Sequence, residues 1–346
     1  MVDLRSDTLT QPTPAMRDAI ARAEVGDEQK REDPTVLELE RRGAELLGHE
    51  EAVYLPTATM ANQIALRIHS RPGEELLAHE HSHIVLYEQG GPSVHAGLAV
   101  RTLGGEAGRF SGDDLRAAYR PATTHTSGTR VVTLENTHNS SGGRVWPVEL
   151  VADVSAACHE LDVRLHLDGA RLMNAAVAAG VPAAEYGRLF DTVTLCLSKG
   201  LGCPLGALLA GPAALMAEAR RGKHLFGGAM RQAGIVAAAG VHALEHHVDR
   251  LADDHARARR LAEAWHGAGV PVRLDAVETN FVQVDVAPLG LTADEAMARM
   301  SAEGVLLSPT IHPTVLRAVT HLDVDDDGVD HACEAVPRAL GVLARV

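Results

Sequence analysis

Aromatic residues make up only 3% of this 346-residue chain, and its 32 basic residues are outnumbered by 46 acidic ones. The net charge of −14 argues against a nucleic-acid or acidic-membrane partner, because phosphate-rich surfaces bind to basic patches. It still leaves room for a local basic pocket. The N-terminus is acidic and lacks an apolar stretch, so we expect no signal peptide. The sequence contains no run of eighteen apolar residues, so no transmembrane helix is predicted.

Cysteine is also scarce, and the four cysteines are scattered without CxxC spacing. A disulfide framework or a zinc knuckle is therefore not predicted. Together with the lack of a leader segment, this makes the cytoplasm the expected location.

Short apolar segments alternate with helical segments through most of the chain, which predicts an α/β fold with a mostly parallel central sheet flanked by helices. The predicted strands are Ala52–Leu55, Glu75–Ala78, Val100–Leu103, Val131–Glu135, Val163–Asp168 and Thr192–Leu197. The predicted helices include Pro34–Leu47, Leu150–Leu161, Leu172–Ala179 and a long region over Arg231–Gly267. Asp33 and Gly48 are typical caps for the first of these helices.

The last hundred residues have a different pattern, with predicted strands at Val270–Leu274, Phe281–Val286 and Leu316–Thr320 and a helix at Ala293–Glu303. We expect a large domain over residues 1–245, including the N-terminal segment. A smaller α+β domain is expected over residues 246–346.

Two neighbouring predicted strands end in residues that can carry chemistry. Asp168 ends one strand and Lys199 follows the other, 31 residues later. Ligands of open α/β sheets sit at the carboxyl ends of strands, so both side chains should face one crevice. Asp168 alone could be a helix cap, and Lys199 alone could be a surface lysine. As a pair, they suggest an acid beside a cationic ring nitrogen and a desolvated amine for Schiff-base chemistry.

A phosphate site should accompany that pair. Thr57, Ala58 and Thr59 precede a helix and offer hydroxyl and backbone N–H groups at its positive end. Taken alone, they could be simple caps. With Asp168 and Lys199 they complete the set of groups that pyridoxal 5′-phosphate (PLP) needs.

The alternating histidines His79, His81 and His83 would share one face of a strand, as metal ligands can. No matching Cys, Asp or Glu cluster accompanies them, so we expect no metal. We favour instead that His83 stacks on an aromatic cofactor ring. Arg171, Arg317 and Lys223 are candidates for holding a substrate carboxylate or the cofactor phosphate.

These motifs are similar, in order and over nearly the whole chain, to those of the low-specificity L-threonine aldolases, PLP enzymes of the aspartate-aminotransferase-like fold type I. The matching stretches are Asp3–Thr8, Val25–Asp27, Glu32–Val36, Thr59–Asn62, Glu135–Asn139, Asp168–Arg171, Leu197–Gly202, Met230–Gly234 and Arg317–His321.

The resemblance assigns roles residue by residue. It implies that Lys199 forms the Schiff base, that Asp168 pairs with the pyridine nitrogen and that His83 stacks on the ring. Thr57, Ala58 and Thr59 would hold the phosphate, and Lys223 would contact it across a subunit interface. Ser6, Arg171 and Arg317 would hold the substrate carboxylate, and His125 would be a second histidine near the substrate β-hydroxyl. The resemblance also implies a homotetramer of dimers with shared active sites.

The implied reaction is retro-aldol cleavage of L-threonine, L-allo-threonine and related β-hydroxy-α-amino acids to glycine and an aldehyde. Either His83 or His125 could be the base. One departure leaves the side-chain preference open: Gln29-Lys30-Arg31 stands where the family usually has Val-Tyr-Gly, and that tyrosine usually lines the active site. β-Elimination, transamination, a transaldolase reaction on the same scaffold, or ligand binding without turnover are the alternatives.

Overall fold

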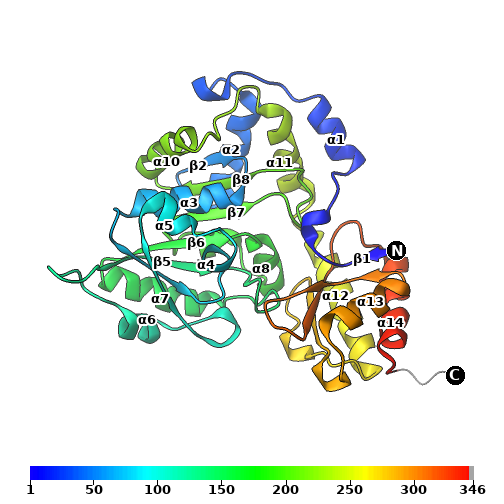
Figure 1. The fold of residues 1–346 in the computed structure, drawn as a ribbon. Helices are drawn as coiled ribbons and strands as arrows, with labels where there is room; N and C mark the ends of the chain where they lie inside the picture. Colours follow the sequence, from blue (N-terminus) through cyan, green and yellow to red (C-terminus); the bar gives the residue numbers. More distant parts are fainter. Residues whose placement is uncertain (343–346) are drawn as a thin grey trace.

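A seven-stranded sheet forms the centre of the chain in this computed structural model, which describes residues 1–342 (Figure 1). In spatial order its strands are β2 (Glu51–Leu55), β8 (Ala207–Gly211), β7 (Thr192–Cys196), β6 (Arg164–Gly169), β5 (Thr129–Glu135), β3 (Glu75–His79) and β4 (Ala99–Leu103). The strands β3 to β7 pair in parallel, and β8 runs antiparallel to both β7 and β2. The predicted, mostly parallel sheet is confirmed.

Helices cover both faces of this sheet, and alternate residues of each strand contact opposite layers. On β2, Val53 and Leu55 pack under α3 (Ala58–His69) and α10 (Ala213–Leu225), whereas Ala52 and Tyr54 belong to the larger core on the opposite face. That larger core also contains residues of α2 (Pro34–Leu47) and α7 (Val148–Glu160). Because successive strand side chains point to opposite faces, a run that is apolar throughout is what a sheet covered on both sides requires.

The remaining elements of the first part of the chain are short. They are η1 (Asp7–Leu9), α1 (Pro14–Ala21), η2 (Glu28–Lys30), α4 (His83–Leu86), α5 (Gly91–Ala96), η3 (Glu106–Gly108), α6 (Gly112–Ala118), α8 (Leu172–Ala179) and α9 (Ala183–Gly187).

The caps predicted for α2 are present. The Asp33 carboxylate accepts a hydrogen bond from the Val36 backbone N–H at 3.0 Å, and Pro34 occupies the first helical position. Gly48 ends the helix in the left-handed conformation, with φ of 72°. These caps fix where α2 begins and ends against the sheet.

The C-terminal part has its own core, which includes Trp265 and Val282. This core packs against a three-stranded antiparallel sheet. Its elements are η4 (Leu274–Ala276), β9 (Phe281–Asp285), η5 (Ala287–Leu289), α13 (Ala293–Ala302), β10 (Val305–Leu306), β11 (Ser308–Pro309), β12 (Val315–Val319) and α14 (Asp326–Leu340). The N-terminal strand β1 (Val2–Asp3) pairs with β10, and Leu4 lies in this second core. The N-terminal segment therefore contacts both parts of the fold, because Leu4 packs in the second core and Asp7 pairs with Arg171 beside the large sheet. The division after residue 245 is a proposal.

Two sequence predictions need correction, and one strand was missed. Val270–Leu274 is not a strand: only Val272 makes an isolated bridge, and Leu274 begins a 3₁₀ turn. The predicted long helical region divides into α11 (Gly234–His246) and α12 (Leu251–Gly267). The antiparallel strand β8 was not predicted. Among residues 1–342, no helix combines the length and apolar character needed to cross a bilayer.

Candidate active site

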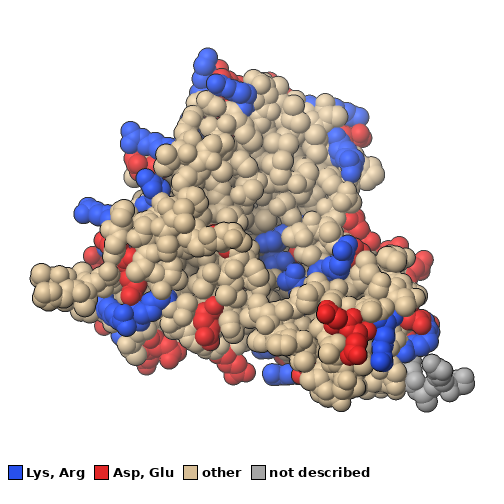
Figure 2. Space-filling model, in the orientation of Figure 1, with Lys and Arg blue, Asp and Glu red and all other residues tan. Residues whose placement is uncertain are grey.

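The carboxyl ends of the parallel strands open into a cavity of about 420 Å³. Basic side chains gather in the hollow between the large sheet and the C-terminal part (Figure 2). The cavity is lined by Ser6, Thr8, His83, Tyr87, Glu135, Asn139, Ser140, Ala170, Arg171, Lys199, Pro309, Thr310, Ile311 and Arg317. Three separate parts of the chain thus build it: the N-terminal segment, the sheet edge and the C-terminal part.

Lys199 lies just after β7, in a tight turn where its carbonyl accepts a hydrogen bond from Gly202 N–H at 2.8 Å. The chain has only three lysines, at positions 30, 199 and 223, and among these only Lys199 lines the cavity. Within residues 1–342 its ammonium has no protein hydrogen-bond acceptor or ion-pair partner. The side chain is therefore available to a ligand.

Two carboxylates stand side by side at the ends of the neighbouring strands, because the register of β5 and β6 pairs Glu135 with Asp168. Both are buried. The Asp168 carboxylate accepts hydrogen bonds from Asn62 Nδ2 at 2.9 Å and from the Ala170 backbone N–H at 3.1 Å. Burial and the adjacent Asp168 charge raise the pKa of Glu135, although two backbone N–H groups partly oppose the shift.

His83 opens α4 and faces the cavity with its ring partly exposed. Its backbone N–H donates to Glu135 at 2.6 Å, and its Nδ1–H donates to the buried Glu88 carboxylate at 3.0 Å. This bond fixes the tautomer of the neutral ring and leaves Nε2 as the atom with a free lone pair. Burial alone would lower the pKa of His83, but the Glu88 hydrogen bond and the Asp168 and Glu135 charges raise it.

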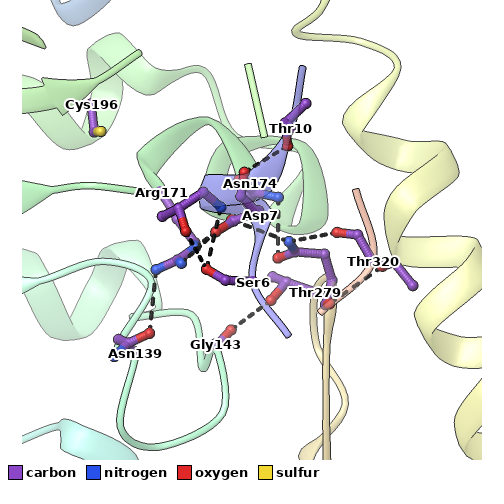
Figure 3. Close-up of polar contacts among 12 residues, drawn as sticks. Ser6, Asp7, Thr10, Asn139, Gly143, Arg171, Asn174, Cys196, Thr279 and Thr320 are labelled. Atoms are coloured by element: carbon purple, nitrogen blue, oxygen red, sulfur yellow. Dashed lines mark hydrogen bonds and ion pairs between the residues drawn. The ribbon is translucent and has the colours of Figure 1, made fainter. Parts of the chain in front are cut away.

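Two arginines, Arg171 and Arg317, line the other side of the cavity. Figure 3 shows Arg171 with its partners Asp7 and Asn139. The Arg171 guanidinium donates twice to the Asp7 carboxylate, at 2.6 and 2.7 Å, and both side chains are buried. Burial alone would raise the pKa of Asp7, but the charge and hydrogen bonds of Arg171 lower it to about 2. Arg317 donates to Asn139 at 2.8 Å and to Ser308 at 3.1 Å. Burial and the Arg171 charge lower the pKa of Arg317.

Three basic side chains, those of Arg171, Arg317 and Lys199, line this cavity. Asp7 pairs with one of the two guanidinium groups. Arginine is suited to planar carboxylates, which it binds through paired N–H groups. The cavity therefore has an arginine half and a half that carries an amine, a histidine and an acid.

The chain is similar to known proteins over most of its length. The beta-eliminating lyase family profile matches residues 3–287. A low-specificity L-threonine aldolase of Escherichia coli K12 is 40% identical over 328 residues, which cover 94% of this chain and 95% of that protein. A low-specificity L-threonine aldolase of Arabidopsis thaliana is 37% identical over 345 residues, covering 98% and 96%.

The chain belongs to the low-specificity L-threonine aldolase family. Among solved structures, a threonine aldolase of Leishmania major aligns with a TM-score of 0.85 at 20% identity, covering 98% of this chain and all of that one. An aspartate aminotransferase of Thermus thermophilus aligns with a TM-score of 0.71 at 15% identity, covering 99% of both chains. These structural likenesses establish fold type I, as predicted.

The structure does not bring every predicted residue to the cavity lining. Asp168, expected to face the same crevice as Lys199, is buried and is not among the side chains that line the cavity. Thr57 caps α3, its hydroxyl accepting from Met60 N–H at 3.1 Å, and both Thr57 and Thr59 are exposed outside the cavity lining. Lys223 is buried, forming an ion pair with Glu28 and donating to the Tyr54 carbonyl at 2.6 Å.

The remaining predicted histidine also lies elsewhere. His125 is exposed on the loop between α6 and β5, and it does not line the cavity. Lys30, at the position of the family tyrosine, is likewise outside the lining. Of the histidine run, His79 donates to the Gly105 carbonyl at 3.1 Å. The expectation that no acidic cluster accompanies these histidines needs correction, because possible ligand atoms of His83, Glu88 and Asp168 lie within 4.8 Å of one another.

Sequence reasoning assigned no role to Asp7, Asn139, Glu88 or Glu135. Glu135 carried a usable signal, because it ends a predicted strand as Asp168 does. Asp7 carried none, since its partner Arg171 is 164 residues away in the sequence.

Proposed function

We propose that this aldolase cleaves L-threonine, L-allo-threonine and related β-hydroxy-α-amino acids to glycine and an aldehyde, with PLP as its cofactor. The observation that carries the proposal is one cavity lined by a free lysine, a histidine and two arginines. Family membership supports the reaction type, since the relatives are named low-specificity L-threonine aldolases.

The residues present fit PLP. Lys199 would bond the cofactor aldehyde, Asp168 would accept from the pyridine N–H and His83 would lie against the ring. The exposed start of α3, with Thr57, Ala58 and Thr59, offers hydroxyl and N–H groups to the phosphate. When bound, PLP supplies the electron sink for breaking the Cα–Cβ bond.

The chain itself binds and orients the amino acid. Arg171 and Arg317 pair with its carboxylate, and Ser6 lies in the same half of the cavity. His83 accepts the β-hydroxyl proton at Nε2, because its Nδ1–H is held by Glu88. His83 is favoured over His125 as the base, since only His83 lines the cavity.

Borohydride trapping tests the assignment. Reduction of the PLP-bound protein followed by peptide mapping should find the cofactor on Lys199, and a label on Lys30 or Lys223 would refute the assignment. The unaltered protein should release acetaldehyde and glycine from L-threonine. Lys199→Ala should lose both cleavage and the visible absorption band.

β-Elimination is the second candidate, because the matching family profile is that of beta-eliminating lyases. It would release ammonia and a keto acid from threonine in place of acetaldehyde and glycine. Assaying both product pairs in one incubation separates the two reactions.

The proposal extends to a homotetramer of dimers, in the cytoplasm. Val94 on α5 is 74% exposed and Leu225 at the end of α10 is 62% exposed, and both helices pack on α3, whose start is proposed to hold the phosphate. Exposed apolar side chains of this size are typical of subunit contacts. All four cysteines are free thiols, which suits a reducing compartment. Light scattering should give a tetramer mass, and Val94→Asp should lower it.

A further inference from the structure

A chain of buried hydrogen bonds runs behind Asp168, away from the cavity. His69 Nε2 lies 2.8 Å from Thr192 Oγ1, which lies 2.8 Å from His166 Nδ1. His166 Nε2 lies 3.2 Å from Asn62 Oδ1, and Asn62 Nδ2 is 2.9 Å from both Asp168 and Glu88. All of these side chains are buried.

The fold explains how the chain of bonds is built. Asn62 and His69 are two turns apart on α3, so they project from the same side of the helix toward the sheet. His166 and Asp168 are alternate residues of β6 and share a face, and His166 pairs in register with Thr192 of β7. One helix and two strands thus supply every link.

Each hydrogen bond in this series has only one possible assignment of donor and acceptor. The Asn62 carbonyl oxygen only accepts, so the hydrogen bond to it must come from His166 Nε2–H. Burial lowers the pKa of His166 to about 3, so the ring is neutral and its Nδ1 accepts from the Thr192 hydroxyl. The Thr192 oxygen then accepts from His69 Nε2–H. Burial likewise lowers the pKa of His69, to about 4. Every donor therefore points toward the carboxylates.

We propose that Asn62 is a positioning residue for Asp168 and Glu88, held in place by the His69–Thr192–His166 chain so that both carboxylates stay ionised. The Asn62 amide nitrogen donates one hydrogen to each carboxylate, and its other end is fixed by His166. Hydrogen bonds that follow one another in one direction polarise and strengthen the next.

This arrangement gives the proposed cofactor site its charge. An ionised Asp168 is the partner that a cationic pyridine nitrogen needs, and an ionised Glu88 keeps Nδ1–H on His83. Glu135 is a third carboxylate in the same region, and burial and the Asp168 charge raise its pKa. The Asn62 N–H groups are the donors that stabilise the charged forms of Asp168 and Glu88 beside it. The role toward PLP rests on the proposed function, but the ionisation of the two carboxylates does not.

Two substitutions at one position give a matched pair. His166→Gln keeps an N–H donor at the reach of Nε2, whereas His166→Leu has none. Asn62→Ala removes the two donors themselves. Thr192→Val deletes a hydroxyl with almost no change in shape, so it still tests the series of hydrogen bonds if a more disruptive variant fails to fold.

Thermal unfolding of the full chain, with and without bound PLP, is then measured from pH 5 to pH 8. Hydrogen bonds from Asn62 favour the charged carboxylates, so a variant that lacks these donors should bind more protons in its native state than the unaltered protein does. The Tm deficits of Asn62→Ala and His166→Leu should therefore grow as the pH rises. His166→Gln should show a smaller deficit with little pH dependence.

PLP affinity is the second readout, taken from absorbance titration of the cofactor-free chain. Asn62→Ala and His166→Leu should weaken binding about tenfold, the scale expected when a group that orients a ligand-binding residue is lost, and His166→Gln should partly restore it. Tm deficits that do not change with pH, with equal PLP affinity for His166→Leu and His166→Gln, would overturn the proposal. Failure of the unaltered chain to bind PLP would refute the proposed function, while the pH series without cofactor still decides the role of Asn62.

Discussion

The two halves of the cavity carry opposite charge and are built in different ways. On one half, His83 and Glu135 line the cavity and the buried carboxylates of Glu88 and Asp168 lie beside His83; all of them come from the large sheet and the segments that follow its strands. On the other, Arg171 and Arg317 come from the large sheet and the C-terminal part, with Asp7 from the N-terminal segment between them.

This difference separates two tasks. The acidic half is fixed by parallel strand ends, whose register leaves little freedom, and it suits a cofactor that is bound throughout turnover. The arginine half depends on three parts of the chain staying together, so it can respond to a substrate that enters and leaves. Substitutions in the acidic half should therefore change cofactor binding and kcat, whereas those in the arginine half should change KM.

The largest effect on the acidic half is expected for Asp168→Asn. The amide has nearly the same shape but carries no charge to pair with a cationic ring nitrogen. We expect kcat to fall by about a hundredfold or more, a typical result of removing one electrostatic contact at a reacting centre, with weaker PLP binding. Steady-state kinetics and PLP titration check this, and a variant that keeps full kcat would contradict the role of Asp168.

Asp7→Asn should have the largest effect on the arginine half. It leaves the buried Arg171 guanidinium without its counter-charge, which costs about 3–5 kcal/mol when one partner of a buried pair is removed. Denaturant unfolding should show this loss. Because the pKa of Asp7 is lowered to about 2, its contribution is complete above the unfolded pKa and disappears as the pH falls toward 2. The deficit of Asp7→Asn should therefore shrink in acid, and a deficit independent of pH would argue against the ion pair.

The same contrast explains what could be predicted from the sequence. Asp168 and Lys199 could be placed at one edge of the sheet because Asp168 lies at the end of one apolar strand and Lys199 follows another, and parallel strand ends lie at one edge. Strand β8 was missed because its apolar run, Ala207–Gly211, has no helical crossover before it to mark a new strand. The break between α11 and α12 was missed because residues 247–250 contain no glycine or proline.

The arginine half depends on tertiary structure. Nothing near Asp7 in the sequence indicates a buried ion pair, and Asn139 gains its role only because Arg317 reaches it from the C-terminal part. Local patterns locate residues at strand ends, but they do not show which distant segments close over them.

A smaller effect is expected for Arg317→Leu, which removes one cationic donor from the carboxylate site but leaves Arg171 and Asp7 paired. KM for L-threonine should rise between about tenfold and a hundredfold, as for the loss of a hydrogen bond to a charged group. PLP affinity should not change. Arg317→Lys keeps the charge but not the paired N–H groups. Its KM should lie between that of the unaltered protein and that of Arg317→Leu. An altered PLP affinity with an unchanged KM would show that Arg317 serves the cofactor.

The smallest effect is expected for Glu88→Gln, which replaces the carboxylate next to His83 by a neutral amide. The Glu88 hydrogen bond and the nearby carboxylate charges raise the pKa of His83, so its loss should lower that pKa. Since His83 must be neutral to accept the β-hydroxyl proton, the acid limb of the kcat profile should move to lower pH by about one unit, the low end of the effect of a close opposite charge. The profile should be measured from pH 5 to pH 9 with saturating PLP, and Arg317→Lys provides the control, because it alters the other half of the cavity and should leave the limb in place. An acid limb that does not move in Glu88→Gln would mean that a group other than His83 takes the proton, and it would remove the main functional distinction between the acidic half and the arginine half.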